Sequence, residues 1–539
     1  DYAFLRFLEN RIQALRDQQT HRLPGPEDRG RLAKPMYEDN VEAVLESLRR
    51  TRDRVSTRFH GIFPSKEPAA TPADEVVKWT ERWRSLQGGL QDPSSPDETD
   101  HEQDPLMRFM QRIDRMAMSH GARRRLDQFM PGLLERIDRL ELDADSLNRV
   151  IDLLLGISRR SAYLVLLVQQ PLALDRMLEL FSASDWIAEK VIRFPALLDE
   201  LIDPALGRQI PSSEQLHQSV QRILRTAQSP ETALESFKYL KLSTELRVAV
   251  AQLKGALEAE ACQAALSDLA SALISGALAI ANDELIQKHG RFRASDTPEI
   301  GVMGYGTLGA KEMGYSSDLD IVFLFQSSQS QSDGKRPLPP ERYYARLAQR
   351  VLSLLTVLTP SGKLYEVDTR LRPNGRAGAL VSHVQAFRDY QLTQAWTWEL
   401  QALTRARFIA GDHEVEVQFN RIRQEVLCQA RDTSELRKDL AEMRERISQQ
   451  HPRRASSPAQ QRFKHGPGGL VDIEFLAQLG VLSQAVIYPR LIQVTATLDQ
   501  LRELAAINWL SDSERDQLVT TAVALRQQRM LTTLGGRIE

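Results

Sequence analysis

The sequence has little cysteine, few aromatic residues and no excess of charge of either sign. Its 539 residues contain 2 cysteines, Cys262 and Cys428, which lie far apart and form no metal-binding or redox motif. That usage fits a reducing compartment, and we expect a cytoplasmic protein. The 70 basic and 72 acidic residues give a formal net charge of −2, and aromatic residues make up 6%. The chain therefore lacks the positive field and the stacking side chains that a nucleic-acid partner requires, and we expect no such partner.

Long hydrophobic runs are missing as well. The longest unbroken apolar stretch covers residues 162–168, which is far shorter than the roughly 20 residues that a membrane-spanning helix needs. We therefore expect no membrane partner. A chain of 539 residues is too long for one hydrophobic core and predicts three or four structural units. It begins with Asp1 instead of Met, inside a helical pattern, so we expect a fragment or a processed product.

The most informative stretch is residues 301–325, GVMGYGTLGAKEMGYSSDLDIVFLF. A short apolar strand ends in a turn punctuated by glycines, and a second, strongly apolar strand begins near Asp318. Asp318 and Asp320 are two residues apart, so on a strand both side chains point to one face. Two carboxylates on one face suit hard divalent cations, and the backbone N–H groups of a glycine turn suit phosphate. The stretch therefore predicts a combined metal and phosphate site.

The string GYGTLG also matches the G-x-G-x-x-G fingerprint of dinucleotide-binding folds. That fold needs a full crossover helix after the glycines and an acidic residue about 20 positions later, at the end of the next strand. Gly314 interrupts the chain soon after the turn, and the aspartates open the next strand instead of ending it. We therefore reject this interpretation. A purely structural alternative, in which Asp318 only caps a turn, leaves the second aspartate and the neighbouring glycines unexplained.

The glycine turn with its Asp-x-Asp pair resembles the nucleotidyltransferase superfamily of the DNA polymerase β type. The longer string GYGTLGAKEMGYSSDLDIVFLF is similar to a narrower group, the glutamine synthetase adenylyltransferase family, whose members are bifunctional enzymes with two such domains. Further similar segments are YEVDTRLRP at 365–373, DYQLTQAWTWELQALTRARFIAGD at 389–412 and GGLVDIEF at 468–475. The resemblance implies the adenylylating, C-terminal half of such an enzyme, together with the tail of its first, deadenylylating domain.

The predicted fold is α+β and mostly helical. A polymerase β-like nucleotidyltransferase domain with a small mixed sheet is expected over 291–435, flanked by helical bundles. The other expected segments are the helical tail of the deadenylylating domain (1–86), a linker (87–105), a helical central or regulatory region (106–290) and a C-terminal helical bundle (436–539). Within the catalytic domain, the patterns predict a helix over 342–358, a strand over 364–373 and a helix over 386–407.

The resemblance implies three catalytic and metal-binding aspartates, Asp318, Asp320 and Asp368. Nucleotidyl transfer needs in-line geometry and a sink for charge, which two Mg²⁺ ions about 3.5–4 Å apart supply, and ATP would be the substrate. For Asp368, a strand with one polar face is the simpler alternative. The residues expected to contact the nucleotide phosphates are Gly306, Gly309, Lys311, Ser316, Ser317, Arg370 and Arg372.

The resemblance also implies the reaction and its partners. AMP would move from ATP to a tyrosine hydroxyl of glutamine synthetase, which regulates nitrogen assimilation, under control by the PII signal protein and by glutamine. Because the glycine–aspartate set occurs once, we expect AMP attachment but not the phosphate-driven removal reaction of the family. The alternatives are a uridylyltransferase acting on a signalling protein, an RNA-end transferase, and a helical scaffold with an inactive transferase domain. The RNA enzyme should show a basic stripe with stacking aromatics, which is absent.

Several residues of the similar segments have no assigned role. Arg405 and Arg407 are candidates for phosphate contacts or for structural ion pairs with Glu399 or Asp412. On a predicted helix, two acidic residues spaced two apart do not share a face, which argues against a metal pair at Asp472 and Glu474. The two tryptophans expected in the core are Trp396 and Trp398.

Overall fold

The computed structural model describes residues 43–51, 73–89, 105–116, 118–158, 161–292, 297–327, 329–359, 361–450 and 463–535. The chain divides into two compact units, Asp1–Glu81 and Arg82–Glu539. The first contains a helix over 43–51 and the beginning of helix α4 (Ala73–Gly89). The expected helical tail over 1–86 is therefore helical where it is described, and the rest of it lies outside the described residues.

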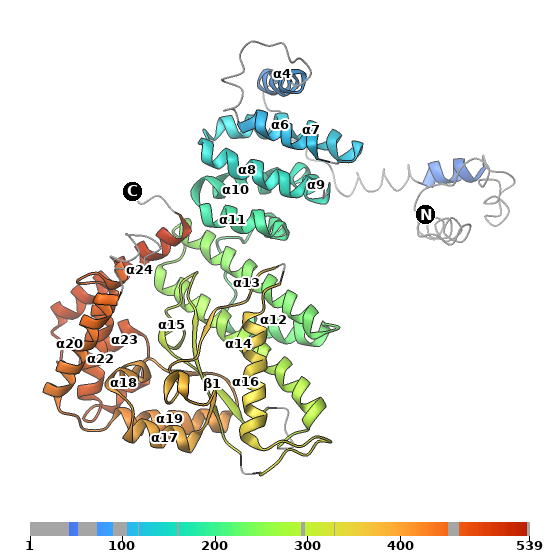
Figure 1. Ribbon diagram of the computed structural model, residues 1–539. Coiled ribbons are helices and arrows are strands. Elements are labelled where there is room, and N and C mark those ends of the chain that lie inside the picture. The colour runs from blue at the N-terminus through green and yellow to red at the C-terminus, as the bar shows by residue number, and fades with distance from the viewer. Residues whose placement is uncertain are drawn as a thin grey trace. The chain divides into compact units, whose positions relative to one another are not determined.

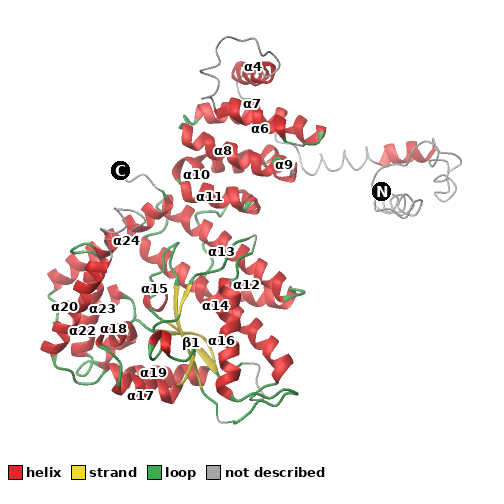
Figure 2. Ribbon diagram, in the orientation of Figure 1, coloured by secondary structure: helices red, strands yellow, loops and turns green. Residues whose placement is uncertain are grey.

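Helices form most of the second unit, as predicted (Figure 2). Many begin at a serine or aspartate whose side chain accepts a hydrogen bond from a backbone N–H of the first turn, for example Ser119, Asp143 and Ser212. The helices before the sheet are α6 (Pro105–Arg115), α7 (His120–Arg139), α8 (Ala144–Ile157), α9 (Ser161–Gln169), α10 (Pro171–Ala183), α11 (Asp185–Arg193), the 3₁₀ helix η2 (Pro195–Ile202), α12 (Ser213–Thr226), α13 (Pro230–Leu253) and α14 (Ala259–His289).

The predicted linker over 87–105 is wrong at its beginning. Helix α4 continues to Gly89 because its C-terminal part packs in the second unit: Trp83 is buried, and Gln87 donates a hydrogen bond of 2.8 Å to Asp127 of α7. At the other end, α6 begins at Pro105. Residues 90–104 lie outside the described part of the chain.

Helix α14 is the longest helix among the described residues, with 31 residues. It is also the one described helix that is long and apolar enough to cross a membrane by length and composition alone. However, 72% of its apolar window is buried inside the structure. Its hydrophobicity therefore matches its position as a core helix, packed against α12, α13 and α16.

A small mixed sheet lies among these helices, as predicted. Strand β2 (Leu319–Phe325) pairs antiparallel with β1 (Ile300–Gly304), which pairs antiparallel with β5 (Arg407–Gly411). On its other edge, β2 pairs in parallel first with β3 (Val367–Asp368) and then with β4 (Val381–His383). Every β2 residue except Asp320 is buried, which explains its continuous apolar sequence.

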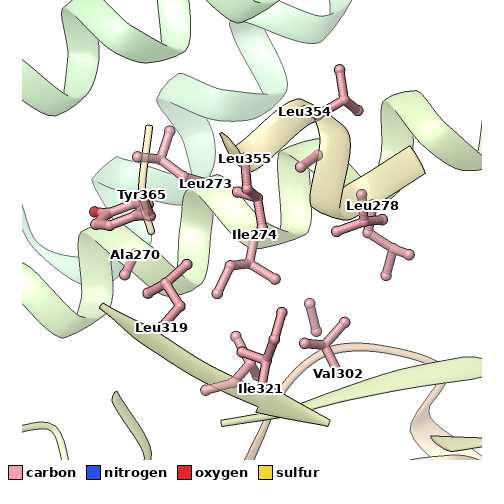
Figure 3. Close-up of a cluster of buried hydrophobic side chains, with 14 of the residues drawn as sticks. Ala270, Leu273, Ile274, Leu278, Val302, Leu319, Ile321, Leu354, Leu355 and Tyr365 are labelled. Atoms are coloured by element: carbon pink, nitrogen blue, oxygen red, sulfur yellow. The ribbon is translucent and has the colours of Figure 1, made fainter. Parts of the chain in front are cut away.

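One face of the sheet packs on α14 and on α16 (Pro340–Thr356). Figure 3 shows Leu319, Ile321 and Val302 of this face close to Ile274 of α14 and Leu355 of α16. This cluster also contains residues of α12 and α13, so the hydrophobic core runs across the expected boundary at 290/291. The helical central region and the sheet therefore share one core, and the domain boundaries stay predictions.

The opposite face is covered by helices that come after strand β4 in sequence (Figure 1). Val322 and Leu324 of β2 belong to a second cluster with residues of these helices. They are α17 (Val384–Thr393), α18 (Thr397–Thr404), α19 (His413–Leu427), α20 (Thr433–Gln450), α22 (Leu470–Gln484), α23 (Thr497–Ala506) and α24 (Asp512–Leu534). The sheet is thus enclosed by helices from both ends of the second unit.

Two predicted elements of the catalytic region differ in the structure. The helix expected over 386–407 is split into α17 and α18, because Glu399 accepts a hydrogen bond from the backbone N–H of Trp396 and starts a new helix. Arg407 already belongs to β5. Trp396 is 70% exposed, so its expected core position is wrong, while Trp398 is half-buried. The helix expected over 342–358 is confirmed as α16.

The strand expected over 364–373 is reduced to Val367–Asp368. Directly after it, the Asp368 side chain accepts a hydrogen bond of 2.8 Å from the backbone N–H of Arg370. This local turn bends the chain away from the sheet. The polar residues that alternate along the expected strand therefore do not form one strand face; they are Glu366, Asp368, Arg370 and Arg372.

Gly309 provides a test of how tightly the glycine turn is packed. A Cβ atom at this position would lie 2.1 Å from the carbonyl oxygen of Arg405 and 2.5 Å from that of Gly304. Backbone atoms cannot move aside as a flexible side chain can, so we expect Gly309→Ala to lower the free energy of unfolding by about 2 kcal/mol or more. Urea denaturation measures this change.

Gly121 of α7 is the matched control, because nothing lies within 4 Å of a Cβ atom built there. Gly121→Ala should be neutral or stabilise the protein by about 0.5–1 kcal/mol, since glycine is the poorer helix former. Equal stability of the two variants would contradict the close packing of Gly309.

Candidate active site

Strand pairing brings Asp320 and Asp368 side by side. The parallel register of β2 and β3 pairs Leu319 with Val367 and Asp320 with Asp368. Neighbours in such a register project to the same face of a sheet. Because Val322 and Leu324 face the C-terminal helices, the two aspartates point to that side as well. Asp318 directly precedes β2 and is exposed.

The electrostatics of Asp320 show that the carboxylates form a cluster. Burial raises the pKa of Asp320 to about 6, and the negative charges of Asp318 and Asp368 add to the rise. Like charges held close together disfavour one another's ionised forms. The predicted trio of aspartates is therefore close enough in space to interact electrostatically.

The glycine turn lies directly against this cluster. The backbone N–H of Tyr305 donates a 2.8 Å hydrogen bond to the carbonyl oxygen of Asp320. Gly306 follows with φ +55°, and a Cβ atom on it would lie 2.2 Å from Asp320 Oδ2. Only glycine fits beside the carboxylate in this conformation. Gly309, in contrast, faces the backbone of Arg405 and Gly304, so its packing accounts for the glycine.

Asp368 is held by Arg370. Its two carboxylate oxygens accept hydrogen bonds from the backbone N–H and the guanidinium of Arg370, and these bonds hold the pKa of Asp368 below its usual range. In the described part of the chain, no group of three or more His, Cys, Asp or Glu side chains is arranged to hold a metal ion. Both oxygens of Asp368 are engaged by Arg370.

The other residues expected to contact phosphate are dispersed. Lys311 Nζ lies 3.1 Å from Asp268 of α14. The guanidinium of Arg372 donates to backbone oxygens of Thr369, Arg376 and Gly378 and so braces its own loop. Ser316 and Ser317 line a separate cavity.

A buried ion network connects the glycine turn to the C-terminal helices. Glu312 lies just after the turn and pairs with Arg405 at 2.5 Å and with Arg526 of α24 at 2.7 Å. It also accepts a 2.7 Å hydrogen bond from the backbone N–H of Thr497 of α23. Burial by itself would raise the pKa of Glu312, but the two guanidiniums lower it below its usual value. Glu312 is therefore a buried, fully paired carboxylate.

The network identifies the partners of Arg405, whose role the sequence left open. Arg405 also binds Glu474 of α22 at 2.7 Å, so its partners are Glu312 and Glu474. The alternative partners have other tasks: Glu399 accepts from Tyr390, and Asp412 caps α19. Arg407 donates to the Ser271 hydroxyl and the Leu308 carbonyl. Asp472 accepts from Arg444 and from the N–H of Gly468, so Asp472 and Glu474 serve different partners.

Sequence reasoning missed the cations that the C-terminal region brings toward the carboxylates. Desolvation, and then the charge of Arg529, lower the pKa of Lys464, while the charges of Glu474 and Asp318 raise it. Lys464 precedes the GGLVDIEF segment, and Arg529 lies on α24. The only feature of the sequence that pointed to these cations was the GGLVDIEF segment, whose role the sequence left open. The candidate site therefore combines carboxylates from the sheet with cations from the C-terminal region.

Comparisons with known proteins agree with this geometry. A family model described as glutamate-ammonia ligase adenylyltransferase matches residues 174–422, which include the glycine turn and all three aspartates. A curated protein of Xanthomonas campestris pv. campestris is 39% identical over 518 residues, covering 94% of this chain and 54% of the relative. One of Nitrosococcus oceani is 39% identical over 544 residues, covering 97% and 55%. Both are named bifunctional glutamine synthetase adenylyltransferase/adenylyl-removing enzyme.

The chain belongs to the glutamine synthetase adenylyltransferase family. It spans about half the length of the curated relatives it matches. A second family model, described as GlnD PII-uridylyltransferase, matches residues 1–63 and 441–533. Those segments lie outside the sheet and contain none of the three aspartates. In this member of the family, the sheet thus matches the adenylyltransferase model, whereas the last helices of the chain match the uridylyltransferase model.

The buried ion network around Glu312 leads to a prediction about the stability of this adenylyltransferase family member. Glu312→Gln removes the negative charge that two buried arginines share. Breaking a buried pair leaves an uncompensated charge, so we expect the free energy of unfolding to fall by about 3–5 kcal/mol. Chemical denaturation followed by circular dichroism measures the loss.

The control is Glu442→Gln on α20, whose pair with Arg446 is exposed, with 51% and 66% of the side chains accessible. That change should cost less than about 0.5 kcal/mol. If Glu312→Gln were as stable as this control, the network would not stabilise the fold as described.

Proposed function

We propose that this chain moves AMP from ATP to a tyrosine hydroxyl of glutamine synthetase, at a nucleotidyltransferase domain of the polymerase β type. The observation that carries the proposal is the register of β2 and β3, which sets Asp320 beside Asp368, with Gly306 against the Asp320 carboxylate. The family relationship supports the protein substrate, because the relatives are named for glutamine synthetase. Cytoplasmic location, and regulation by the PII protein and glutamine, are part of the same proposal.

The donor set fits Mg²⁺, because carboxylate oxygens are its preferred protein ligands. Asp318 and Asp320 would hold two ions, with Asp368 joining them once Arg370 releases its oxygens. When bound, the ions would supply the positive charge that activates a hydroxyl and offsets the charge of leaving pyrophosphate. The raised pKa of Asp320 points the same way, since crowded carboxylates favour a cation between them.

The protein side chains have separable tasks in this proposal. Gly306 lets the backbone of the turn lie directly against the Asp320 carboxylate, where a metal-bound phosphate would approach it. Arg370 keeps Asp368 ionised, and this carboxylate would accept the tyrosine proton only once Arg370 releases one of its oxygens. Lys464 and Arg529, on the same side, are candidates to bind the triphosphate, which adds to the positions expected from the sequence.

The catalytic prediction concerns the three aspartates. Asp318→Asn, Asp320→Asn and Asp368→Asn should each reduce transfer at least about a hundredfold, because each removes charge from the metal site. The fold should remain intact, since the substitution is isosteric and relieves repulsion at Asp320. Transfer of label from ATP to purified glutamine synthetase measures the rate.

Asp389→Asn is the control, because Asp389 is 62% exposed on α17 and pairs weakly with Arg388 at 3.5 Å. Its activity should equal that of the unaltered chain. Near-normal transfer by Asp320→Asn would overturn the proposed site. Label from UTP but not from ATP would favour the uridylyltransferase alternative.

The metal prediction uses stability instead of activity. Mg²⁺ with ATP should raise the melting temperature, because a ligand that binds only the folded form stabilises it by mass action. Asp320→Asn should lose most of this increase, while Asp389→Asn should keep it. An unchanged increase in Asp320→Asn would place the metal and nucleotide elsewhere.

A further inference from the structure

A cavity of about 280 Å³ lies between the central helices and the loops that enter the catalytic strands. Its walls come from α11, α13, the 313–317 loop before β2, and the 361–366 loop before β3. Leu364 and Tyr365 of the second loop belong to the hydrophobic cluster on the α14 face. The catalytic aspartates point to the opposite face, so the cavity is separate from the carboxylate cluster.

The lining of this cavity is strongly basic. It includes Lys190, Arg193, Lys238, Lys241 and Lys363, against two carboxylates. Three of the lysines are engaged: Lys238 with Glu235 at 3.6 Å, Lys241 with Glu245, and Lys363 with Glu366. Among the residues that the structure describes, Lys190 forms no ion pair, and its ammonium lies 5.0 Å from the Trp186 ring centroid. Desolvation lowers the pKa of Lys190, as expected for an ammonium held without a counterion of its own. The cavity thus offers net positive charge to a small anion.

Glu245 gives the cavity a second, unusual property. Its side chain is 4% exposed, and its Oε1 atom is paired with Lys241. Its Oε2 atom is buried and has no hydrogen-bond donor in the structure. A buried acceptor without a donor costs about 1–3 kcal/mol, which a ligand could recover by donating a hydrogen. The cavity therefore favours an anion that also carries an O–H group.

We infer that this cavity is a binding site for inorganic phosphate in its singly protonated form. The anion would lie among Lys190, Arg193 and Lys241 and donate its remaining O–H to Glu245 Oε2. Orthophosphate retains such a proton at neutral pH, whereas sulfate is a dianion of similar size without one. The same carboxylate that accepts from phosphate would repel sulfate, so the site would distinguish the two.

The position of the cavity suggests what such binding would affect. Ser316 and Ser317 line it and lead directly into Asp318, while Glu366 lines it two residues before Asp368. A bound anion would therefore order both loops from behind the catalytic face. The site goes beyond the proposed transfer reaction, and its existence does not depend on that reaction.

Isothermal titration calorimetry of the whole chain tests the site, with orthophosphate and sulfate titrated separately at neutral pH and constant ionic strength, without Mg²⁺ or nucleotide. We expect phosphate to bind at least about tenfold more tightly than sulfate, because a hydrogen bond from the phosphate O–H to the charged Glu245 carboxylate is strong enough to account for that ratio. Lys190→Gln should weaken phosphate binding by about tenfold or more for the same reason. Lys438→Gln, an exposed lysine on α20, should change nothing.

Glu245→Gln gives a result that misfolding cannot imitate, because it should gain affinity for sulfate. The substitution removes the repelling charge, and the preference for phosphate should disappear. Asp320→Asn should bind phosphate as the unaltered chain does, which separates this site from the catalytic one. Equal affinity of the unaltered chain for both anions, unchanged binding in Lys190→Gln, or loss of binding in Asp320→Asn would each overturn the inference.

Discussion

The paired charge of Glu312 is the interaction on which the arrangement of this protein depends. It lies between Arg405, next to the catalytic strands, and Arg526, near the end of the described chain. A carboxylate buried to this degree is stable only if its partners are in place. Since Glu312 and these two arginines come from three separate segments, the glycine turn, the 405 segment and α24 must assume their positions together. The orientation of the turn beside Asp320 is a consequence of that joint constraint.

The two sides of the sheet have different tasks. Leu319, Ile321 and the other residues on the α14 side form a continuous hydrophobic core with the central helices. On the opposite side, Val322 and Leu324 of β2 pack against hydrophobic residues, whereas Asp320 at the start of the strand makes the face polar. Successive side chains of β2 point to opposite faces of the sheet. One face therefore packs on the hydrophobic core that supports the candidate site, and the other carries its carboxylates.

Local patterns predicted the parts of the site that are close in sequence. The glycine turn, the Asp-x-Asp pair and the buried β2 strand follow from composition and spacing, and Asp368 followed from the similarity to a family segment. The same patterns failed where distant partners decide the structure. Arg405 was considered with Glu399 and Asp412, but its partner Glu312 lies 93 positions away. Likewise, strand 364–373 looked regular until the Asp368–Arg370 turn ended it. A side chain that closes a turn on its own backbone cannot be distinguished by alternation alone.

The enclosure of the sheet by helices from both ends of the unit has a consequence for biosynthesis. Synthesis runs from the N-terminus, so α12–α14 and the strands leave the ribosome before the C-terminal helices do. The α14 face of the sheet can therefore be buried while the chain is still growing. The other face stays uncovered until α22, α23 and α24 have emerged, and Arg526 is among the last residues of the described chain. The face that carries the carboxylate cluster would thus be covered only after α24 has been synthesised, and a chain that stops before α24 would carry the sheet without the Arg526 partner of Glu312.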